Sequence, residues 1–260
     1  MSRARRFRQG LAWHAASIGT AVALLAVWAV VCQRQWISPI YLPSPLDTWT
    51  ALREGMLDGE LARLTGGTIQ RMIWGWALAS ALGMALGALI GTSAALRVWL
   101  QPTLEFLRPL PASAILPVAI AFFGLSPGMA LFVIAFGAIW PVLLATVHGF
   151  ASVEPRLAEV ARVMGLSRLD FMWKIGLPNA LPDALGGMRL SMTVALILAI
   201  VAEMLAGQEG LGNAILLAAR SYRSADLFAG VALLGAIGLV SNAGILVLER
   251  KLLAWKLVRD

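Results

Sequence analysis

The sequence predicts an all-α fold: a polytopic membrane protein with six transmembrane helices, a charged cytoplasmic loop and both termini in the cytoplasm. Composition is the first reason, because 59 % of the 260 residues are hydrophobic, 13 % are charged and the mean hydropathy is +0.79. These values lie outside the range of soluble globular proteins. The second reason is a set of six segments that approach or exceed the roughly 18 to 20 apolar residues needed to cross a hydrocarbon core about 30 Å thick. They lie near residues 14–34, 68–93, 106–123, 129–150, 185–206 and 228–249.

The distribution of lysine and arginine is the third reason, and it predicts the orientation. With both termini inside, the inner segments carry 15 of these residues and the outer segments carry 6. Membrane proteins concentrate positive charge in their cytoplasmic loops. Both ends of the chain and the polar segment 154–182 are therefore expected in the cytoplasm.

Few residues could support catalysis or bind a metal. The chain has one cysteine, Cys32, and two histidines, His14 and His148, so we expect no disulfide, no metal site and no cofactor. No Gly-x-x-x-x-Gly-Lys-Ser/Thr pattern is present, so the chain cannot hold a nucleotide in a P-loop. No nucleophile with a matching base lies in the spans, and no basic patch with interleaved aromatics suggests nucleic acid. The sequence therefore predicts neither an enzyme nor a nucleic-acid-binding protein.

The first predicted span is followed by an outer segment. Four arginines precede the apolar run 15–31, as in a signal peptide. We interpret the run as a retained span, because it is long enough to cross the membrane and no small-x-small cleavage site leads into a polar domain. Further on, Ser44, Pro45 and Asp47 have the spacing of an N-cap, a first-turn proline and an N3 acid. A short helix is expected to begin there and to lie along the outer surface.

The second span carries small residues at intervals of four. Such a ridge lets another helix backbone approach closely, and close packing drives helix association in lipid. We expect it to serve helix packing, and it could also provide a surface for self-association. The residues of the ridge are Gly75, Ala79, Gly83, Gly87 and Gly91.

The third span is interrupted by prolines. Pro109, Pro111 and Pro117 fall within it, and proline removes a backbone donor and displaces its helical partner. In a membrane the freed carbonyls must be satisfied by protein or water. We therefore expect this segment to face the interior of a helix bundle, where it lines a translocation pathway or a gate.

The segment 154–182 is a charged island with a helical pattern. Apolar residues recur at i, i+3 and i+4 spacing from Val153 to Met164, which predicts a short amphipathic helix. Gly165 is expected to end that helix with a left-handed residue. Ser167 and Asp170 have the spacing of a capping box and predict a second helix, which we expect to end at Pro178. The residues alone leave open a simpler interpretation, in which this hairpin lies on the membrane surface.

The same segment resembles the EAA loop of permease subunits in binding-protein-dependent ATP-binding-cassette importers. The resemblance rests on Glu159-Val160-Ala161, then Gly165 after three intervening residues, and then Ile175-Gly176-Leu177-Pro178 after nine more. Val160 replaces the first alanine of the usual pattern. The resemblance implies that this loop is a coupling helix that docks on a separate ATPase subunit. It assigns that contact to Glu159, Val160, Ala161, Gly165, Ile175, Leu177 and Pro178.

Two further stretches resemble the nitrate, sulfonate and taurine branch of these permeases. They are Leu107-Arg108-Pro109-Leu110-Pro111 and Phe123-Gly124-Leu125-Ser126-Pro127. The resemblance implies a small, mostly anionic solute and a multi-pass protein of the bacterial plasma (inner) membrane. It also implies one permease domain over 1–260, with residues 1–66 as first span and outer segment and 67–250 as the core that includes 154–182.

The resemblance places the outer mouth near the end of the fifth span. Gly210, Leu211 and Gly212 would line it, with Met204 just before them in the translocation pathway or gate. Glu203 is the one acidic residue deep in this span, and we expect it to face the pathway, because an acid facing lipid costs up to about 3 kcal/mol. It could act as a latch between helices or as a charge that tunes anion passage. The alternative is that its carboxylate simply reaches the outer interface.

The implied partners follow from the same resemblance. They are a second copy of this chain, an ATP-binding subunit on the cytoplasmic side, a periplasmic or lipid-anchored solute-binding protein on the outer side, and membrane lipid. The competing hypotheses are a stand-alone secondary transporter, which would need several ionisable residues near the membrane midplane, and an intramembrane enzyme. Glu203 is nearly alone in such a position, which weakens the first alternative, and neither histidine lies near a convincing catalytic partner, which weakens the second.

Overall fold

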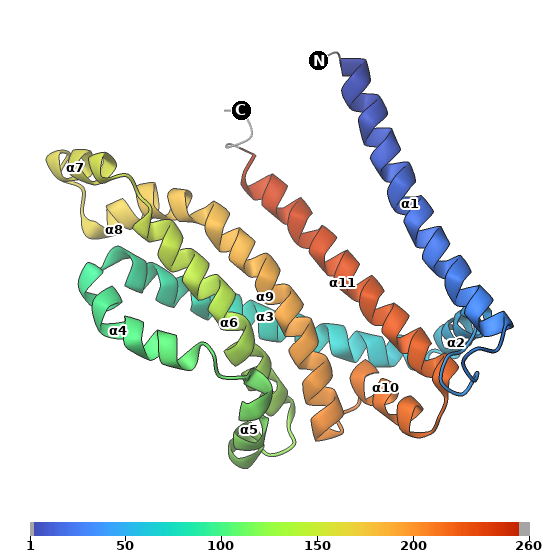
Figure 1. Cartoon of the computed structure of the whole chain (residues 1–260). Helices are drawn as coiled ribbons and strands as arrows, with labels where there is room; N and C mark the ends of the chain where they lie inside the picture. The colour runs from blue at the N-terminus through green and yellow to red at the C-terminus, as the bar shows by residue number, and fades with distance from the viewer. Residues whose placement is uncertain (1–2, 255–260) are drawn as a thin grey trace. The chain divides into compact units, whose positions relative to one another are not determined.

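A computed structural model describes residues 3–254 (Figure 1). The helices group into two compact units. One contains the described residues up to Ala62 together with Ala214–Leu233, and the other contains Arg63–Asn213 and the described residues from Leu234 onward. No strand occurs among the described residues, and the predicted all-α class is confirmed.

The first unit contains α1 (Arg3–Gln33) and α2 (Pro45–Leu57). The predicted start of α2 is confirmed: the Ser44 hydroxyl accepts the backbone N–H of Asp47, and the Asp47 carboxylate accepts the backbone N–H of Ser44. Trp28 of α1 donates its indole N–H to the carbonyl of Pro43 at 2.9 Å. This bond ties the first span to the segment that leads into α2.

The second unit is built on α3 (Glu60–Thr92), α6 (Pro127–Ala151) and α9 (Leu177–Ala206). The small-residue ridge of α3 packs on α6, because a Cβ placed on Gly83, Gly87 or Gly91 would lie within 3.0 Å of Val142, Thr146 or Phe150 respectively. Contacts repeat every four residues on both helices and in the same direction. The two helices are therefore parallel, as expected for two spans that both run from outside to inside.

Helices α6 and α9 lie side by side (Figure 1). Gly187 on α9 permits this approach, since a Cβ there would lie 2.6 Å from the carbonyl oxygen of Pro141. Ser191 donates its hydroxyl to the carbonyl of Ala138 at 2.6 Å. A buried apolar cluster continues from this interface to α5, and it consists of Leu116, Ala119, Met129, Ala130, Val133 and Ala202.

The predicted third span, 106–123, is not one helix. It contains the end of α4 (Ala94–Leu107), then the 3₁₀ turn η1 (Ala112–Ile115) and α5 (Leu116–Phe123). Pro109 and Pro111 occupy the connection, where proline can end a helix without leaving an interior hydrogen bond unmade. The apolar helical stretch 112–123 is about 20 Å long, at about 2.0 Å per residue in the 3₁₀ turn and about 1.5 Å in α5, which is shorter than the membrane core.

Five helical segments in the described residues are long and apolar enough to cross a membrane: Ala16–Gln33, Glu60–Thr92, Pro127–Ala151, Leu169–Ala206 and Ser224–Leu252. Each overlaps one of the other five predicted spans, and Leu169–Ala206 also extends back into the predicted loop 154–182. The count of six and the cytoplasmic termini stay predictions. Helix α11 (Ser224–Leu252) ends near Glu249, whose carboxylate lies 3.9 Å from the guanidinium of Arg189 on α9.

The segment 154–182 forms helix α7 (Pro155–Val163), a left-handed Gly165 with φ of +69°, and helix α8 (Arg168–Phe171). The N–H groups of Gly165 and Leu166 return to the carbonyls of Arg162 and Ala161, which is the Schellman arrangement that glycine favours. The prediction that a second helix ends at Pro178 is wrong. Instead, the π-helical turn η2 (Met172–Gly176) joins α8 to α9 and places that proline in the first turn of α9, where no N–H is required.

Candidate functional site

Glu203 on α9 is fully buried and lies at the centre of a polar network. Arg71 of α3 donates Nη2–H and Nε–H to its Oε1 at 2.7 and 3.1 Å. The hydroxyl of Thr68, one turn earlier on α3, donates to the same oxygen at 2.8 Å. The backbone N–H of Gly212 donates to Oε2 at 2.8 Å. Both oxygens of this carboxylate therefore have partners, as a buried charge requires.

The segment Gly210–Gly212 closes over the carboxylate because it lacks side chains where the contact is tightest. A Cβ on Gly210 would collide with the carboxyl group of Glu203 and the guanidinium of Arg71, and one on Gly212 would lie 2.7 Å from the carbonyl oxygen of Ile200. The turn starts at Gly207, which has φ of +62° and caps α9. Leu211 between the two glycines is fully buried.

Helix α10 (Leu211–Arg220) begins directly on this network. The N–H of Leu211 donates to the Thr68 hydroxyl at 2.9 Å, while Gly212 donates to Glu203. Two of the N–H groups that a helix start leaves unpaired are thus satisfied by side chains of α3 and α9. The carboxylate also lies where the helix dipole favours negative charge. The network therefore links α3, α9 and the start of α10, as a latch would.

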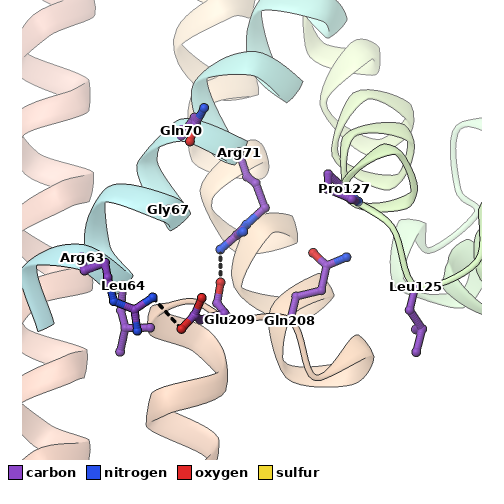
Figure 2. Close-up of a pocket in the computed structure, with 9 residues that line it drawn as sticks. All are labelled: Arg63, Leu64, Gly67, Gln70, Arg71, Leu125, Pro127, Gln208 and Glu209. Atoms are coloured by element: carbon purple, nitrogen blue, oxygen red, sulfur yellow. Dashed lines mark hydrogen bonds and ion pairs between the residues drawn. The ribbon is translucent and has the colours of Figure 1, made fainter. Parts of the chain in front are cut away.

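An open cleft of about 480 Å³ lies beside this network (Figure 2). Figure 2 shows Arg63, Gln70 and Arg71 on α3 forming one wall, with the α9–α10 turn opposite. Arg71 Nη2 also donates to the carbonyl of Glu209 at 2.6 Å, and Arg63 pairs with the Glu209 carboxylate at 2.5 Å. The remaining lining residues are Leu64, Gly67, Leu125, Pro127 and Gln208.

The loop 154–182 presents an exposed apolar face. Val160, Val163 and Met164 on α7 and its C-cap are 53 %, 89 % and 70 % exposed, although a nine-residue helix normally buries its apolar side. Ala161 differs, because it is buried within the chain. Glu159 is exposed, whereas Ile175, Leu177 and Pro178 are half-buried on the π turn and the first turn of α9.

The base of the loop is fixed to the end of α6. The side chain of Asn179 donates to the carbonyl of Gly149 at 2.8 Å, and a Cβ on Gly176 would lie 2.7 Å from the ring of Phe150. On α8, hydrogen bonds from Lys174 and Ser167 lower the pKa of the Asp170 carboxyl from its usual value. A rigid stem thus holds the exposed face of α7.

The other predicted pathway residues are not gathered at one place. Pro109, Pro111 and Pro117 are exposed along the α4–α5 connection, and Met204 is half-buried next to Glu203. Sequence reasoning misses Arg71, which it counts as an outer-segment charge, and Thr68, which has no distinctive spacing. A signal exists for the first, because Arg71 is an arginine inside an apolar run, and such a residue normally has a buried partner.

Comparison with known proteins agrees with this architecture. Residues 79–254 match the family described as the binding-protein-dependent transport system inner membrane component. The chain is 34 % identical over 238 residues to the "Putative aliphatic sulfonates transport permease protein SsuC" of Bacillus subtilis (strain 168), covering 90 % of this chain and 84 % of that one. It is 30 % identical to the taurine transport system permease protein TauC of Escherichia coli (strain K12), over 92 % of this chain and 89 % of that one. It is 32 % identical to the nitrate import permease protein NrtB of Leptolyngbya laminosa, over 87 % and 84 %.

A solved structure shows the same fold. The MetNI methionine ABC transporter in an inward-facing conformation contains a chain that superposes with a TM-score of 0.68 at 17 % identity, covering 75 % of this chain and 97 % of that one. The match of the family over most of the chain, together with these relatives, establishes the assignment. The chain belongs to the inner membrane component family of binding-protein-dependent transport systems and is a multi-pass transport permease, not an enzyme.

Proposed function

We propose that this permease carries a small anion into the cell and is driven by an ATPase subunit docked on α7. The observation that carries the proposal is the exposed apolar face of α7, because a short amphipathic helix held out on a fixed stem needs a protein groove to bury it. In this assignment Glu159, Val160 and Gly165 contribute to the docking surface or its shape. Ala161, Ile175, Leu177 and Pro178 support it from within the chain.

The solute class is supported by the relatives and by the cleft. The relatives carry the names of sulfonate, taurine and nitrate systems, and all three solutes present an oxyanion group. Two arginines line the cleft beside the Glu203 network. When the Glu209 side chain moves away from Arg63, the two arginines leave the cleft with net positive charge, which raises the local concentration of anions. We therefore assign this permease a small oxyanion as its solute.

The partners are proposed on the same basis. Binding-protein-dependent systems require an ATPase and a solute-binding protein, and we propose that the former meets α7 in the cytoplasm and the latter meets the outer face, with both termini of this chain inside. The whole chain acts as one permease domain in a homodimer surrounded by lipid. Glu203 acts as a latch beside the pathway, with Met204 and the prolines 109, 111 and 117 in neighbouring parts of the route.

Uptake by reconstituted vesicles tests the coupling assignment. Vesicles that contain the permease, its ATPase and its binding protein should accumulate radiolabelled taurine or nitrate only with internal ATP. Val163→Arg should fold normally, because this side chain is 89 % exposed, yet should lose ATPase binding and uptake. Ala161→Arg provides the contrast, since its buried position predicts a lower melting temperature as well. Normal ATP-driven uptake by Val163→Arg would disprove docking on α7.

A further inference from the structure

The cleft in Figure 2 contains a solvent-exposed ion pair between Arg63 and Glu209. Arg63 and Glu209 are 58 % and 68 % exposed at the side chain, so both ends of the pair face solvent. Exposed pairs contribute little to stability, because water and salt screen them and two long side chains must be ordered. This pair can therefore open at low cost when another anion is available.

Arg71 is held differently. Its side chain is only 20 % exposed, and its partner Glu203 is fully buried. Nε and Nη2 are committed to Glu203 and to the carbonyl of Glu209. Among the described residues no partner is found for Nη1, which leaves two fixed N–H donors at the wall of the cleft. Both remaining donors sit on the single nitrogen Nη1, which can donate a charge-assisted hydrogen bond to an oxygen of an oxyanion.

The charge balance of the cleft allows one additional anion to bind when Glu209 moves away. With Glu209 paired to Arg63 and Glu203 paired to Arg71, the positive charges of the cleft are balanced. When Glu209 swings away into solvent, Arg63 and Arg71 together exceed Glu203 by one positive charge. One monovalent anion would restore the charge balance. The carboxylate of Glu209 therefore competes with such an anion for Arg63.

The remaining lining adds an apolar part. Leu64, Leu125 and Pro127 contribute carbon surface to the cleft next to the arginines, and its volume exceeds what an inorganic oxyanion alone would fill. We propose that the cleft is a binding site for a small monovalent organic oxyanion, a sulfonate or carboxylate with a short carbon chain, which displaces Glu209 from Arg63 and takes the free donors of Arg71. The proposal deepens the proposed function and names a site for its solute class.

Direct binding to the full-length permease in lipid nanodiscs tests the site without ATP or transport. Ligand-observed NMR titration with ethanesulfonate should show saturable binding, and the neutral isostere ethanesulfonamide should not compete. Arg63→Gln should weaken binding about ten-fold, as expected for the loss of a charge-assisted hydrogen bond. Glu209→Gln should strengthen it about two- to five-fold, because the competitor loses its charge. Arg53→Gln, an equal charge change at an exposed arginine that does not line the cleft, should leave binding unchanged.

The opposite signs of the two cleft variants separate binding from a structural role. If Arg63 and Glu209 only stabilised the fold, both variants would weaken binding together or leave it as in the wild type, and either result overturns the proposal. Absence of saturable ethanesulfonate binding also overturns it. Nitrate that binds as tightly as ethanesulfonate, with the same dependence on Arg63, would overturn the organic part. None of these results depends on ATP-driven uptake, so failure here and failure of the proposed function are distinguishable.

Discussion

At the scale of single residues, the ion pair of Glu203 and Arg71 carries a large desolvation cost, because the Glu203 carboxylate is fully buried. A carboxylate with no exposed surface loses its hydration, and only a full set of hydrogen bonds compensates for it. The structure supplies that set from three places: the guanidinium of Arg71, the hydroxyl of Thr68 and the N–H of Gly212. Such a pair contributes less to the net free energy of folding than to the selection of one packing arrangement. Removing one partner is costly, because it leaves the other charge buried without a counterion.

A double-mutant cycle should reveal the coupling. Arg71→Met removes the counterion and the guanidinium donors of Glu203 and leaves its carboxylate with only the Thr68 hydroxyl and the Gly212 N–H, so we expect a loss of about 3 kcal/mol. Glu203→Gln keeps a hydrogen-bond acceptor but leaves the arginine without its counterion. The double variant should be more stable than the sum of the two losses predicts, by about 1.5 kcal/mol or more. Unfolding free energies in detergent measure this.

The exposed pair provides the matched control for that cycle. Arg63→Met and Glu209→Gln remove equivalent charges at side chains that are 58 % and 68 % exposed, so each should change stability by less than about 1 kcal/mol. If the losses at Arg71 and Glu203 add without coupling, the two residues do not act as one buried unit.

The sequence could predict one half of this network. Glu203 stands out as a deep acid in an apolar span, and its cost in lipid indicates a protein environment. Its partner Arg71 is 132 positions away in the chain, so no local spacing connects the two residues. Charge counting also treats this arginine as an outer-segment residue. Only the packing of α3 against α9 brings them together.

At the scale of elements, one glycine on α9 sets the distance to α6. Gly187 faces α6, where a Cβ would lie 2.6 Å from the carbonyl oxygen of Pro141 and 2.8 Å from the Cβ of Ala145. A backbone carbonyl in a packed helix cannot move aside as a flexible side chain can. The adjacent Gly186 has open space, with no heavy atom within 4 Å of the position that a Cβ would occupy.

This neighbouring pair allows a controlled comparison. Gly187→Ala should push α6 and α9 apart and cost about 1 to 3 kcal/mol, the range of overpacking in a close-packed interior. Gly186→Ala should be neutral or should stabilise by up to about 1 kcal/mol, because alanine is the better helix former. Melting temperatures of the two purified variants decide the matter. A similar loss for both would mean that the cost arises from helix propensity or lipid contacts rather than from the α6–α9 interface.

At this scale, the start or end of a helix can be predicted from the sequence when residues next to it in the chain determine it. The start of α2, with its Ser44 cap, and the end of α7 at Gly165 are predictable, because caps act within a few residues. The extent of the break in the third span is not, since prolines signal an interruption but not its length. Pro178 suggests a helix end, whereas the π turn before it widens the helix and lets it continue. Tertiary packing on α6 holds that turn, and no local pattern encodes it.

At the scale of the whole molecule, the surfaces left open indicate where partners must lie. The ridge of Gly83, Gly87 and Gly91 packs on α6 within one chain, so it cannot also be a free surface for self-association. In the apolar window of α1 none of the residues is buried, and in that of α11 11 % are. We propose that lipid or a second copy covers these two helices. In the proposed homodimer, a second copy would supply further walls for the transport route.

The proposed homodimer requires a test that separates it from the ATPase. Two permeases could be held together by their own contact or only through a pair of ATPase subunits. Co-expression of tagged and untagged permease with the ATPase should recover untagged chain with the tag, and mass photometry should count two permease chains in each complex. With Val163→Arg in both copies, the ATPase should be lost while untagged permease is still recovered, because closed two-fold contacts form between identical surfaces. Recovery that disappears together with the ATPase would show that the permeases meet only through it, and a single permease in the intact complex would refute the homodimer altogether.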